Sequence, residues 1–279
     1  MIGSIALVLL SAATSATPCE SLAGLKLDKT TITSAQMVPE GPAPARGGGR
    51  GRGAAAGAPG AAAPAAPGGA AANAPAANAQ PPAMIPAHCR LQIVLKPSSD
   101  SLINMEMWLP PAEKWNGKFM GVGNGGFAGS IQGLANDMPQ ALRLGYATAG
   151  TDTGHQEQGG AWAIGHPEKM IDFGYRATHE MTLKSKQIVK AFYEREAQYS
   201  YFKGCSTGGR MALMEAQRYP DDYDGIIAGS LANRHIHMWT AGIARSAELS
   251  RHPEGALSAE KAMLVNQTVT NTCDTLKEG

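Results

Sequence analysis

The sequence predicts an α/β fold with a mainly parallel sheet that is covered by helices on both faces. Two observations predict it. After residue 90, strand-like and helix-like segments alternate along the chain, and this alternation is typical of parallel sheets. In addition, the run GCSTG at 204–208 lies between a strand-like and a helix-like segment. A G-x-S-x-G run in that context predicts a serine raised above the edge of such a sheet.

The first half of this region supplies four strand-like runs. Residues 91–97 and 102–110 alternate apolar and polar side chains between turn-like flanks. Residues 118–130 are expected to form a strand that runs into a glycine-rich loop, and 144–152 to form a buried strand.

The second half completes the alternation with two helices and two strands. The helix expected over 173–196 has apolar residues at helical spacing. These residues are Met181, Ile188, Val189 and Phe192. A strand over 199–204, a helix over 210–220 and a strand over 223–230 follow.

The N-terminus has the pattern of a secretory signal peptide over 1–16. Residues 2–10 are apolar, and Ala13, Ser15 and Ala16 are small residues suited to cleavage. The apolar run is too short to span a membrane. A secreted or periplasmic location is therefore expected, with a first buried strand as the alternative for this segment. The basic residue that usually precedes the apolar run is missing, which questions the assigned start.

An N-terminal segment over 17–40 precedes an Ala/Gly/Pro-rich stretch over 41–83. That stretch has almost no large apolar side chain, so it is expected to be a disordered insertion. Three arginines among its glycines are similar to an RNA-binding segment, but no aromatic residue lies between them. They are Arg46, Arg50 and Arg52. Lys plus Arg number 24 and Asp plus Glu 23, so neither nucleic acid nor a membrane is an expected partner.

Four cysteines, at 19, 89, 205 and 273, allow three disulfide pairings, and the sequence alone does not choose among them. A Cys19–Cys89 disulfide would tie together the ends of the 41–83 insertion. Disulfides persist in the oxidising compartment that a signal peptide implies.

Ser206 is the expected nucleophile. In a nucleophile elbow its backbone is strained, and Gly204 and Gly208 leave room where side chains would collide across the turn. The backbone amide of Thr207, at the start of the next helix, can donate to a developing oxyanion. The alternative is a glycine-rich turn with an idle serine.

A second oxyanion donor is expected in the glycine-rich loop GVGNGGFAGS, which follows an earlier strand. Gly126 is the preferred donor and Gly125 the alternative. A plain glycine-rich turn is the competing interpretation. A dinucleotide site is not expected, because the G-x-G-x-x-G spacing and its acidic partner are missing.

Four longer runs resemble the tannase and feruloyl esterase family, which has an α/β-hydrolase fold. The runs are WNGKFMGVGNGGFAGSI (115–131), GYATAGTDTGH (145–155), WAIGHPEKMIDFGYRATHEMT (162–182) and the stretch from 199 to 229. They cover most of residues 88–232. The resemblance implies a serine carboxylic ester hydrolase that cleaves small aromatic (phenolic) esters through an acyl-enzyme. It implies no cofactor for catalysis, and it leaves the oligomeric state open.

The resemblance also implies a role for Cys205. In that family the cysteine before the nucleophile is bonded to a cysteine beside the catalytic histidine. No histidine after Ser206 has a cysteine beside it, and these histidines are His235, His237 and His252. They are expected to be exposed or to line a pocket, Asp224 to be a turn residue, and Asp152 and His155 to shape a loop.

The family likewise places a cysteine followed by an acid at the opening of a calcium-binding lid. Cys273 and Asp274 match that position, and Asp274 would be the first calcium ligand. Lys277 stands where the family has a further aspartate, which weakens the prediction of structural calcium. These features together predict that residues 84–232 form the N-terminal part of the hydrolase core and that residues 233–279 form the start of a truncated lid domain. They also predict that the chain is a fragment, with the triad acid, the triad base and the partners of Cys205 and Cys273 beyond it. A non-catalytic module that binds phenolic esters, or an inactive fragment, is the alternative.

Overall fold

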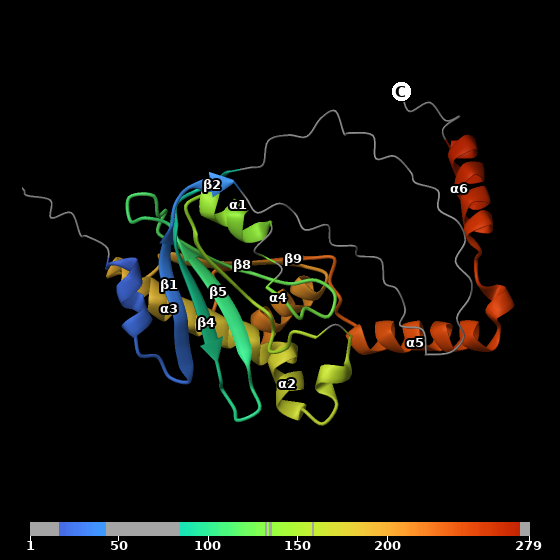
Figure 1. The fold of residues 1–279 in the computed structure, drawn as a ribbon, viewed down its shortest axis with the longest axis horizontal. Coiled ribbons are helices and arrows are strands. Elements are labelled where there is room, and N and C mark those ends of the chain that lie inside the picture. The colour runs from blue at the N-terminus through green and yellow to red at the C-terminus, as the bar shows by residue number, and fades with distance from the viewer. Residues whose placement is uncertain (1–16, 43–83, 132, 134–135, 158, 274–279) are drawn as a thin grey trace, which may run out of the picture. The chain divides into compact units, whose positions relative to one another are not determined.

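The computed structural model describes residues 17–42, 84–131, 133, 136–157 and 159–273. The segment 1–16, most of the 41–83 stretch and Asp274 lie outside the described residues. The chain divides into two units, Met1–Leu231 and Ala232–Gly279. Figure 1 labels the elements of both units, and each unit is described by itself.

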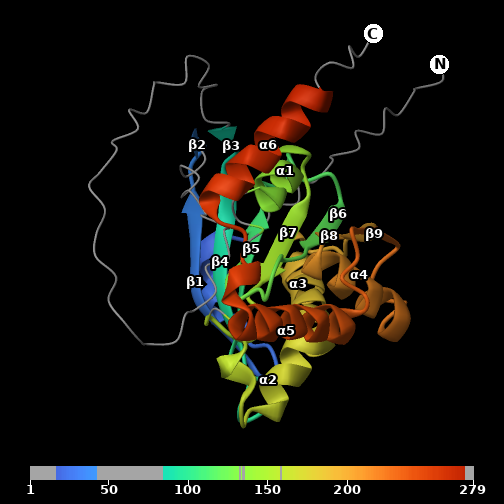
Figure 2. The same ribbon diagram turned by 90° about the vertical axis from the view of Figure 1, so that its right-hand side faces the viewer.

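Within the described residues, seven strands of the first unit form one sheet in the order β1-β4-β5-β7-β6-β8-β9. Figure 2 looks onto this sheet, with β1 at its left edge and β9 at its right. The strands are β1 (Thr30–Val38), β4 (His88–Leu95), β5 (Ile103–Leu109), β6 (Lys118–Val122), β7 (Ala147–Thr151), β8 (Tyr199–Cys205) and β9 (Gly225–Gly229).

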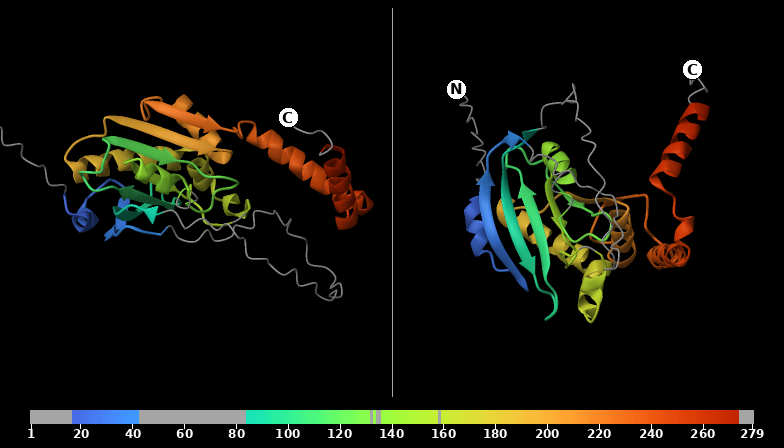
Figure 3. Two further views of the ribbon diagram at one scale, coloured as in Figure 1. Left: turned by 90° about the horizontal axis from the view of Figure 1, so that it is seen from above. Right: turned by 45° about the vertical axis from the view of Figure 1, so that its right-hand side comes forward.

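Strand directions confirm the expected α/β class. The pairs β7–β6, β6–β8 and β8–β9 are parallel, and the pairs β1–β4, β4–β5 and β5–β7 are antiparallel. Only β1 and β5 therefore run against the other five strands. The two views of Figure 3 show how the strands fan out with the twist of the sheet. The parallel half of the sheet carries the segments that were expected to hold the site.

The sheet has an apolar layer on each face, because successive side chains of a strand point to opposite sides. In β6, Phe119 belongs to one hydrophobic cluster and Met120 packs against another. The larger cluster takes Met181 and Ile188 from the long helix α3, and the smaller one takes Met138 from α1. Helices thus cover both faces, as the sequence predicted.

The helices of the first unit follow the strands that they cover. They are η1 (Cys19–Gly24), α1 (Asp137–Arg143), η3 (Ala161–Ala163), α2 (Pro167–Ile171), η4 (Asp172–Arg176), α3 (Ala177–Tyr193) and α4 (Thr207–Arg218). The helix expected over 173–196 is one π-helical turn, η4, followed by α3. In Figure 1, α3 runs behind β1, β4 and β5.

The N-terminal segment is anchored to the sheet. A disulfide joins Cys19 of η1 to Cys89 of β4, with the two Cα atoms 5.6 Å apart, and both cysteines are buried. Residues Gly41–Pro42 form β2 and pair antiparallel with Met84–Ile85 of β3. Gly41 and Pro42, which the sequence assigned to the start of the insertion, thus belong to a strand pair.

The second unit contains the helices α5 (His235–Arg251) and α6 (Ala259–Cys273), joined through the turn η5 (Pro253–Gly255). Their apolar side chains are largely exposed, and Ile236, Ile243 and Leu264 are examples. No helix in the described part of the chain is long and apolar enough to cross a membrane.

Candidate active site

Ser206 occupies a sharp turn between β8 and α4, and its side chain is exposed. Its backbone dihedrals are φ 60° and ψ −120°, a combination that L residues rarely adopt because of steric strain. The Ser206 N–H donates to the carbonyl of Gly229 at the end of β9, with an N–O distance of 3.1 Å. The surrounding sheet thus holds this serine in a strained conformation.

Three glycines pack backbone against backbone at the turn. A Cβ on Gly208 would lie 2.8 Å from the carbonyl oxygen of Asn124. A Cβ on Gly204 would collide with the backbone of Gly208, and one on Gly123 would also strike Gly208. Only glycine fits at these three positions, so the end of β6, the end of β8 and the first turn of α4 meet closely.

The glycine-rich loop after β6 is bonded to the turn. The Gly208 N–H donates to the carbonyl of Asn124, with an N–O distance of 2.6 Å, and the Thr207 hydroxyl donates to the carbonyl of Gly126. On its other side the loop is anchored by the Asn124 side-chain amide, which donates to the Thr151 carbonyl at 2.6 Å. The loop is therefore fixed to both the elbow and the end of β7.

The two backbone amides that were expected to hold an oxyanion belong to these bonded segments. Thr207 is the first residue of α4, and Gly126 adopts a φ of +59°. Within the described residues neither amide donates a hydrogen bond to the protein. Apart from its chain neighbours, no described residue has a heavy atom within 4 Å of the position of a Cβ on Gly126. The carbonyl of Gly125 accepts the Ala128 N–H at 3.0 Å, which shapes the loop into a turn.

Asp152 is a structural acid behind the loop. Its carboxylate accepts the Asn104 side-chain amide at 2.6 Å and the Asn104 and Gly154 backbone amides at 3.0 and 2.9 Å. Burial raises the pKa of Asp152, and these hydrogen bonds oppose the rise. Asp152 therefore ties the segment after β7 to β5, as expected for a residue that shapes a loop.

An aromatic cluster lies beside the glycine-rich loop. The His155 ring stacks on Trp162 with centroids 4.0 Å apart and meets the edge of Phe173 at 5.7 Å. Phe127 of the loop lies 6.3 Å from Phe173, and a Cβ on Gly129 would be 3.5 Å from the His155 ring. Burial lowers the pKa of His155, which favours a neutral ring.

Arg210 of α4 holds this cluster against the elbow, a role that the sequence did not predict. Its guanidinium donates to the carbonyls of Gly174 and Phe173 at 2.7 and 2.9 Å, and it lies 4.6 Å above the Phe173 ring. Burial lowers the pKa of Arg210 to about 10. Its place four residues after the serine is a signal visible in the sequence, but its contacts are not.

Among the described residues of the first unit, no histidine is hydrogen-bonded to Ser206. In the first unit, His88 pairs with the Pro86 carbonyl, His166 with Asp100 and His179 with Asp222. Asp224 bonds to Ser200 at the opposite end of β8, its Oδ2 accepting the Ser200 N–H at 2.7 Å. Ser206 lies six positions after Ser200 along the strand, roughly 20 Å away, so Asp224 is a turn residue.

The remaining predicted residues have fewer contacts. Cys205 and Cys273 are both exposed free thiols. In the second unit, His235 accepts the Trp239 indole N–H at 2.9 Å, and His252 lies 3.2 Å from Glu254. His237 belongs to α5 and is exposed. The disulfide partners of Cys205 and Cys273 and the calcium ligand Asp274 stay predictions.

Comparison with known proteins gives consistent matches. Residues 89–278 match the family model described as tannase and feruloyl esterase. A probable feruloyl esterase B of Aspergillus niger is 38% identical over 188 residues, which are 67% of this chain and 35% of that protein. An uncharacterized esterase of Xanthomonas campestris is 36% identical over 268 residues, 95% of this chain and 41% of that protein. The chain thus spans about two-fifths or less of the length of these relatives.

Solved structures share the fold. Feruloyl esterase B from Aspergillus oryzae superimposes with a TM-score of 0.58 at 32% identity, covering 77% of this chain and 36% of the other. An esterase from the same organism gives a TM-score of 0.59 at 30% identity, with coverage of 77% and 37%. A tannin acyl hydrolase from Aspergillus niger, 20% identical over 74% of this chain and 34% of its own, has a TM-score of 0.50 and shows the fold alone.

Proposed function

Since the chain belongs to the tannase and feruloyl esterase family, we propose that it carries the nucleophile and oxyanion hole of a serine carboxylic ester hydrolase. Ser206 is the nucleophile in this proposal. The amides of Thr207 and Gly126 are the oxyanion donors, and Gly125 is the alternative donor. No cofactor takes part in the reaction.

One observation carries the proposal: the strained backbone of Ser206 at the junction of β8 and α4. Such strain is costly and persists only where surrounding structure enforces it. Here the hydrogen bond to Gly229 and the packing of three glycines enforce it. The turn leaves the Ser206 hydroxyl accessible to a substrate, which supports its assignment as the nucleophile.

The chemistry follows from these groups. The Ser206 Oγ attacks the ester carbonyl carbon, and the carbonyl oxygen becomes an oxyanion that accepts hydrogen bonds from the Thr207 and Gly126 amides. The alcohol leaves with a proton, which leaves the acyl group esterified to Ser206. Water then attacks this acyl-enzyme and releases the carboxylic acid. The amides lower the barrier because they are held in place before charge develops.

Aromatic esters are the proposed substrates. The cluster of Phe127, His155, Trp162 and Phe173 lies beside the glycine-rich loop and is largely apolar. The relatives from Aspergillus are named feruloyl esterases. An aromatic acyl group beside the oxyanion loop would be close to this cluster, which supports the choice of substrate.

The proposal names no general base within the described residues and places the triad acid and base outside them. It also includes export, because the Cys19–Cys89 disulfide is stable in an oxidising compartment. Structural calcium at Asp274 remains a prediction, since that residue lies outside the described part of the chain.

The test is hydrolysis of a methyl hydroxycinnamate by the protein translated from the longest open reading frame that encodes this chain. Ser206→Ala is expected to abolish turnover and to leave ester binding intact, since alanine keeps both oxyanion amides. A Cys205→Ala variant is the neighbouring control and is expected to retain hydrolysis above the Ser206→Ala level. Turnover that survives Ser206→Ala would refute the assignment of the nucleophile.

A further inference from the structure

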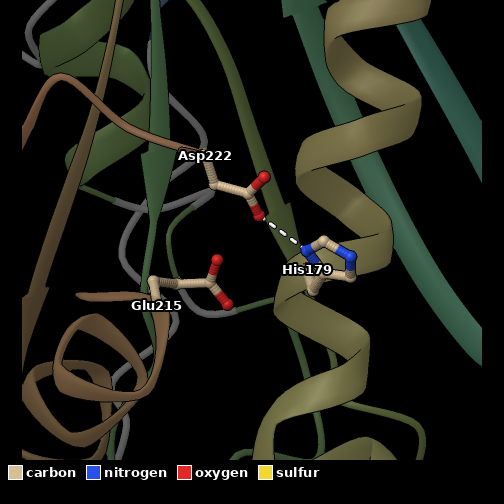
Figure 4. Close-up of side chains that lie close together, drawn as sticks. All are labelled: His179, Glu215 and Asp222. Atoms are coloured by element: carbon tan, nitrogen blue, oxygen red, sulfur yellow. Dashed lines mark hydrogen bonds and ion pairs between the residues drawn. The ribbon is translucent and has the colours of Figure 1, made fainter. Parts of the chain in front are cut away.

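A second group of polar side chains lies at the far end of α4, away from the elbow. His179 comes from α3, Glu215 from α4 and Asp222 from the turn that leads to β9. One potential ligand atom from each lies within 4.8 Å of the other two. The His179 Nδ1 is 2.6 Å from the Asp222 Oδ2. Figure 4 shows the carboxylate of Glu215 pointing toward the other two side chains.

Glu215 is the unusual member of the group. It is 0% exposed, and no described residue donates a hydrogen bond to either of its carboxylate oxygens. Carboxylates are rarely buried in this way without a partner, because the loss of hydration is costly. Burial raises the pKa of Glu215 to about 9, and the neighbouring Asp222 carboxylate adds to the rise.

No cationic side chain of the described residues forms an ion pair with Glu215. Lys186 attracts it from a distance, and its Nζ lies 6.0 Å from the Tyr223 ring centroid. Arg218 is positioned over the Tyr175 ring, at 4.1 Å. The Tyr219 ring stacks on His179 with centroids 3.6 Å apart and forms one wall of the cluster.

Either a proton or a metal cation can neutralise this pair of carboxylates. If Glu215 is protonated, its O–H can donate a hydrogen bond to the Asp222 carboxylate, but the other Glu215 oxygen still has no partner among the described residues. A divalent cation can instead take lone pairs from both carboxylates and from the His179 Nδ1 at once. We propose that His179, Glu215 and Asp222 form a binding site for a divalent transition-metal ion.

The donor set narrows the choice of ion. One imidazole nitrogen and two carboxylate oxygens suit Zn²⁺ or a similar first-row ion better than Mg²⁺ or Ca²⁺, which prefer oxygen alone. In a tetrahedral shell, zinc bonds of about 2.0–2.2 Å hold ligand atoms roughly 3.3–3.6 Å apart. The present separations lie on either side of this range, from 2.6 Å between His179 and Asp222 to within 4.8 Å for the whole group, so side-chain rotations close the site. The His179 side chain is 22% exposed, which gives the ion an entry path. A water molecule would complete a tetrahedral shell.

The proposed ion has a structural role. Glu215 lies nine positions after Ser206, about 13.5 Å along the axis of α4, so the ion does not contact the reacting ester. It joins α3 to α4 and to the turn before β9. Helix α4 begins directly after Ser206, so the ion would fix the far end of the helix that supports the elbow. Binding would displace the Glu215 proton into solvent.

The experiment is a titration of chelator-stripped protein with Zn²⁺, in competition with a chromophoric zinc chelator. The variants Glu215→Gln and His179→Gln each remove one ligand and preserve side-chain size. The control is His252→Gln, which alters the exposed group of His252, Glu248 and Glu254 in the second unit. Circular dichroism establishes that each variant is folded.

We expect the unaltered chain and His252→Gln to bind one equivalent of zinc with equal affinity. Glu215→Gln and His179→Gln are expected to bind zinc at least about tenfold more weakly. Loss of a group that only hydrogen-bonds to a metal ligand lowers metal affinity by about tenfold or more, and loss of a ligand itself should lower it at least as much. Equal zinc affinity in all four proteins would overturn the proposal. So would an infrared carboxylic-acid C=O band, absent from Glu215→Gln, that persists at saturating Zn²⁺, because it would show that a proton occupies the site.

A second measurement covers variants that do not fold. Crystals of the unaltered chain are soaked in Co²⁺ or Zn²⁺, and diffraction data are collected at the absorption edge of the metal. An anomalous difference peak enclosed by His179, Glu215 and Asp222 supports the site. A peak found only elsewhere, or no peak, contradicts it.

Discussion

The hydroxyl of Thr207 donates a hydrogen bond to the carbonyl oxygen of Gly126. This bond joins the two residues whose amides are proposed to stabilise the same oxyanion, although they are 81 positions apart in the sequence. The Thr207 side chain is buried, so water does not compete for the bond. The position of one donor is thereby coupled to the position of the other.

Replacing Thr207 with valine should weaken transition-state stabilisation while leaving substrate binding nearly unchanged. Valine keeps the shape and the backbone amide but leaves the Gly126 carbonyl unpaired, which costs about 1–3 kcal/mol of stability. We expect kcat for a methyl hydroxycinnamate to fall by about tenfold or more in the longest frame that contains this chain. Thr207→Ser keeps the hydroxyl and should retain most of the activity. Equal kcat in the two variants would contradict the coupling.

Gly208→Ala should destabilise the fold at the elbow. Its Cβ would lie 2.8 Å from the Asn124 carbonyl oxygen, which belongs to backbone that is already hydrogen-bonded. We expect the free energy of unfolding to fall by about 1–3 kcal/mol, as in other overpacked sites. Gly174→Ala is the matched control, because no described residue beyond its chain neighbours and its own helical turn has an atom within 4 Å of its Cβ position. Urea denaturation compares them, and a similar midpoint for both variants would refute the close packing.

Replacing residues 43–83 with a four-residue Gly/Asn turn should alter stability little. Pro42 and Met84 are already partners in the β2–β3 pair, so a short turn can join them. The predicted disorder of this segment implies that no core contact is lost. Thermal unfolding should give a midpoint within a few degrees of the original. A large fall would show that the segment contributes to the packing of the domain.

The stability of metal-free protein should depend on pH through Glu215. The folded-state pKa is about 9 and the ordinary value is 4.5, so between these values the folded state binds more protons than the unfolded state. The free energy of unfolding therefore falls as pH rises from about 5 to 9. His179, Asp222, Lys186 and Tyr223 face the same carboxyl and remain in every variant.

Glu215→Gln should remove this part of the slope, since glutamine does not titrate. Glu254→Gln, an exposed substitution in the second unit, should preserve it. Urea unfolding in chelator-containing buffers at several pH values provides the comparison. Identical slopes for both variants would mean that Glu215 is ionised in the folded state.

Much of the first unit could be predicted because its strands and long helix have clear periodic patterns. The sequence predicted β6, β8 and β9 nearly as observed, and the elbow followed from the serine and its two glycines. The sequence predicted that this helix begins at 210, since Gly208 and Gly209 are poor helix formers. In the structure α4 begins at Thr207. These glycines are required by close packing against Asn124 and Gly229, which local propensity does not reveal.

Other features depend on contacts between distant segments. Strand β1 was missed because it is an edge strand with an irregular burial pattern, so no clean alternation marks it. Arg210 donates hydrogen bonds to the carbonyls of Phe173 and Gly174, which lie 37 and 36 positions earlier in the chain. His179 and Asp222 are likewise separated by 43 positions. Side-chain partners at such separations are determined by the tertiary fold rather than by a local pattern.

The central claim is that Ser206 is a nucleophile, and covalent labelling tests it most directly. The longest frame that contains this chain is treated with an alkyl fluorophosphonate, digested and analysed by mass spectrometry, with the 279-residue chain treated in parallel. We predict a phosphonyl adduct on Ser206 in the protein translated from that reading frame and no adduct there in Ser206→Ala. Because the proposed base lies outside the described residues, a protein that lacks this base should be labelled slowly or not at all. Ser230→Ala, another residue with positive φ that follows a strand, should label normally. Full-rate labelling of the 279-residue chain would place the base within it, with His235 and His237 the first candidates, and an adduct on another residue or on none would contradict the assignment of Ser206.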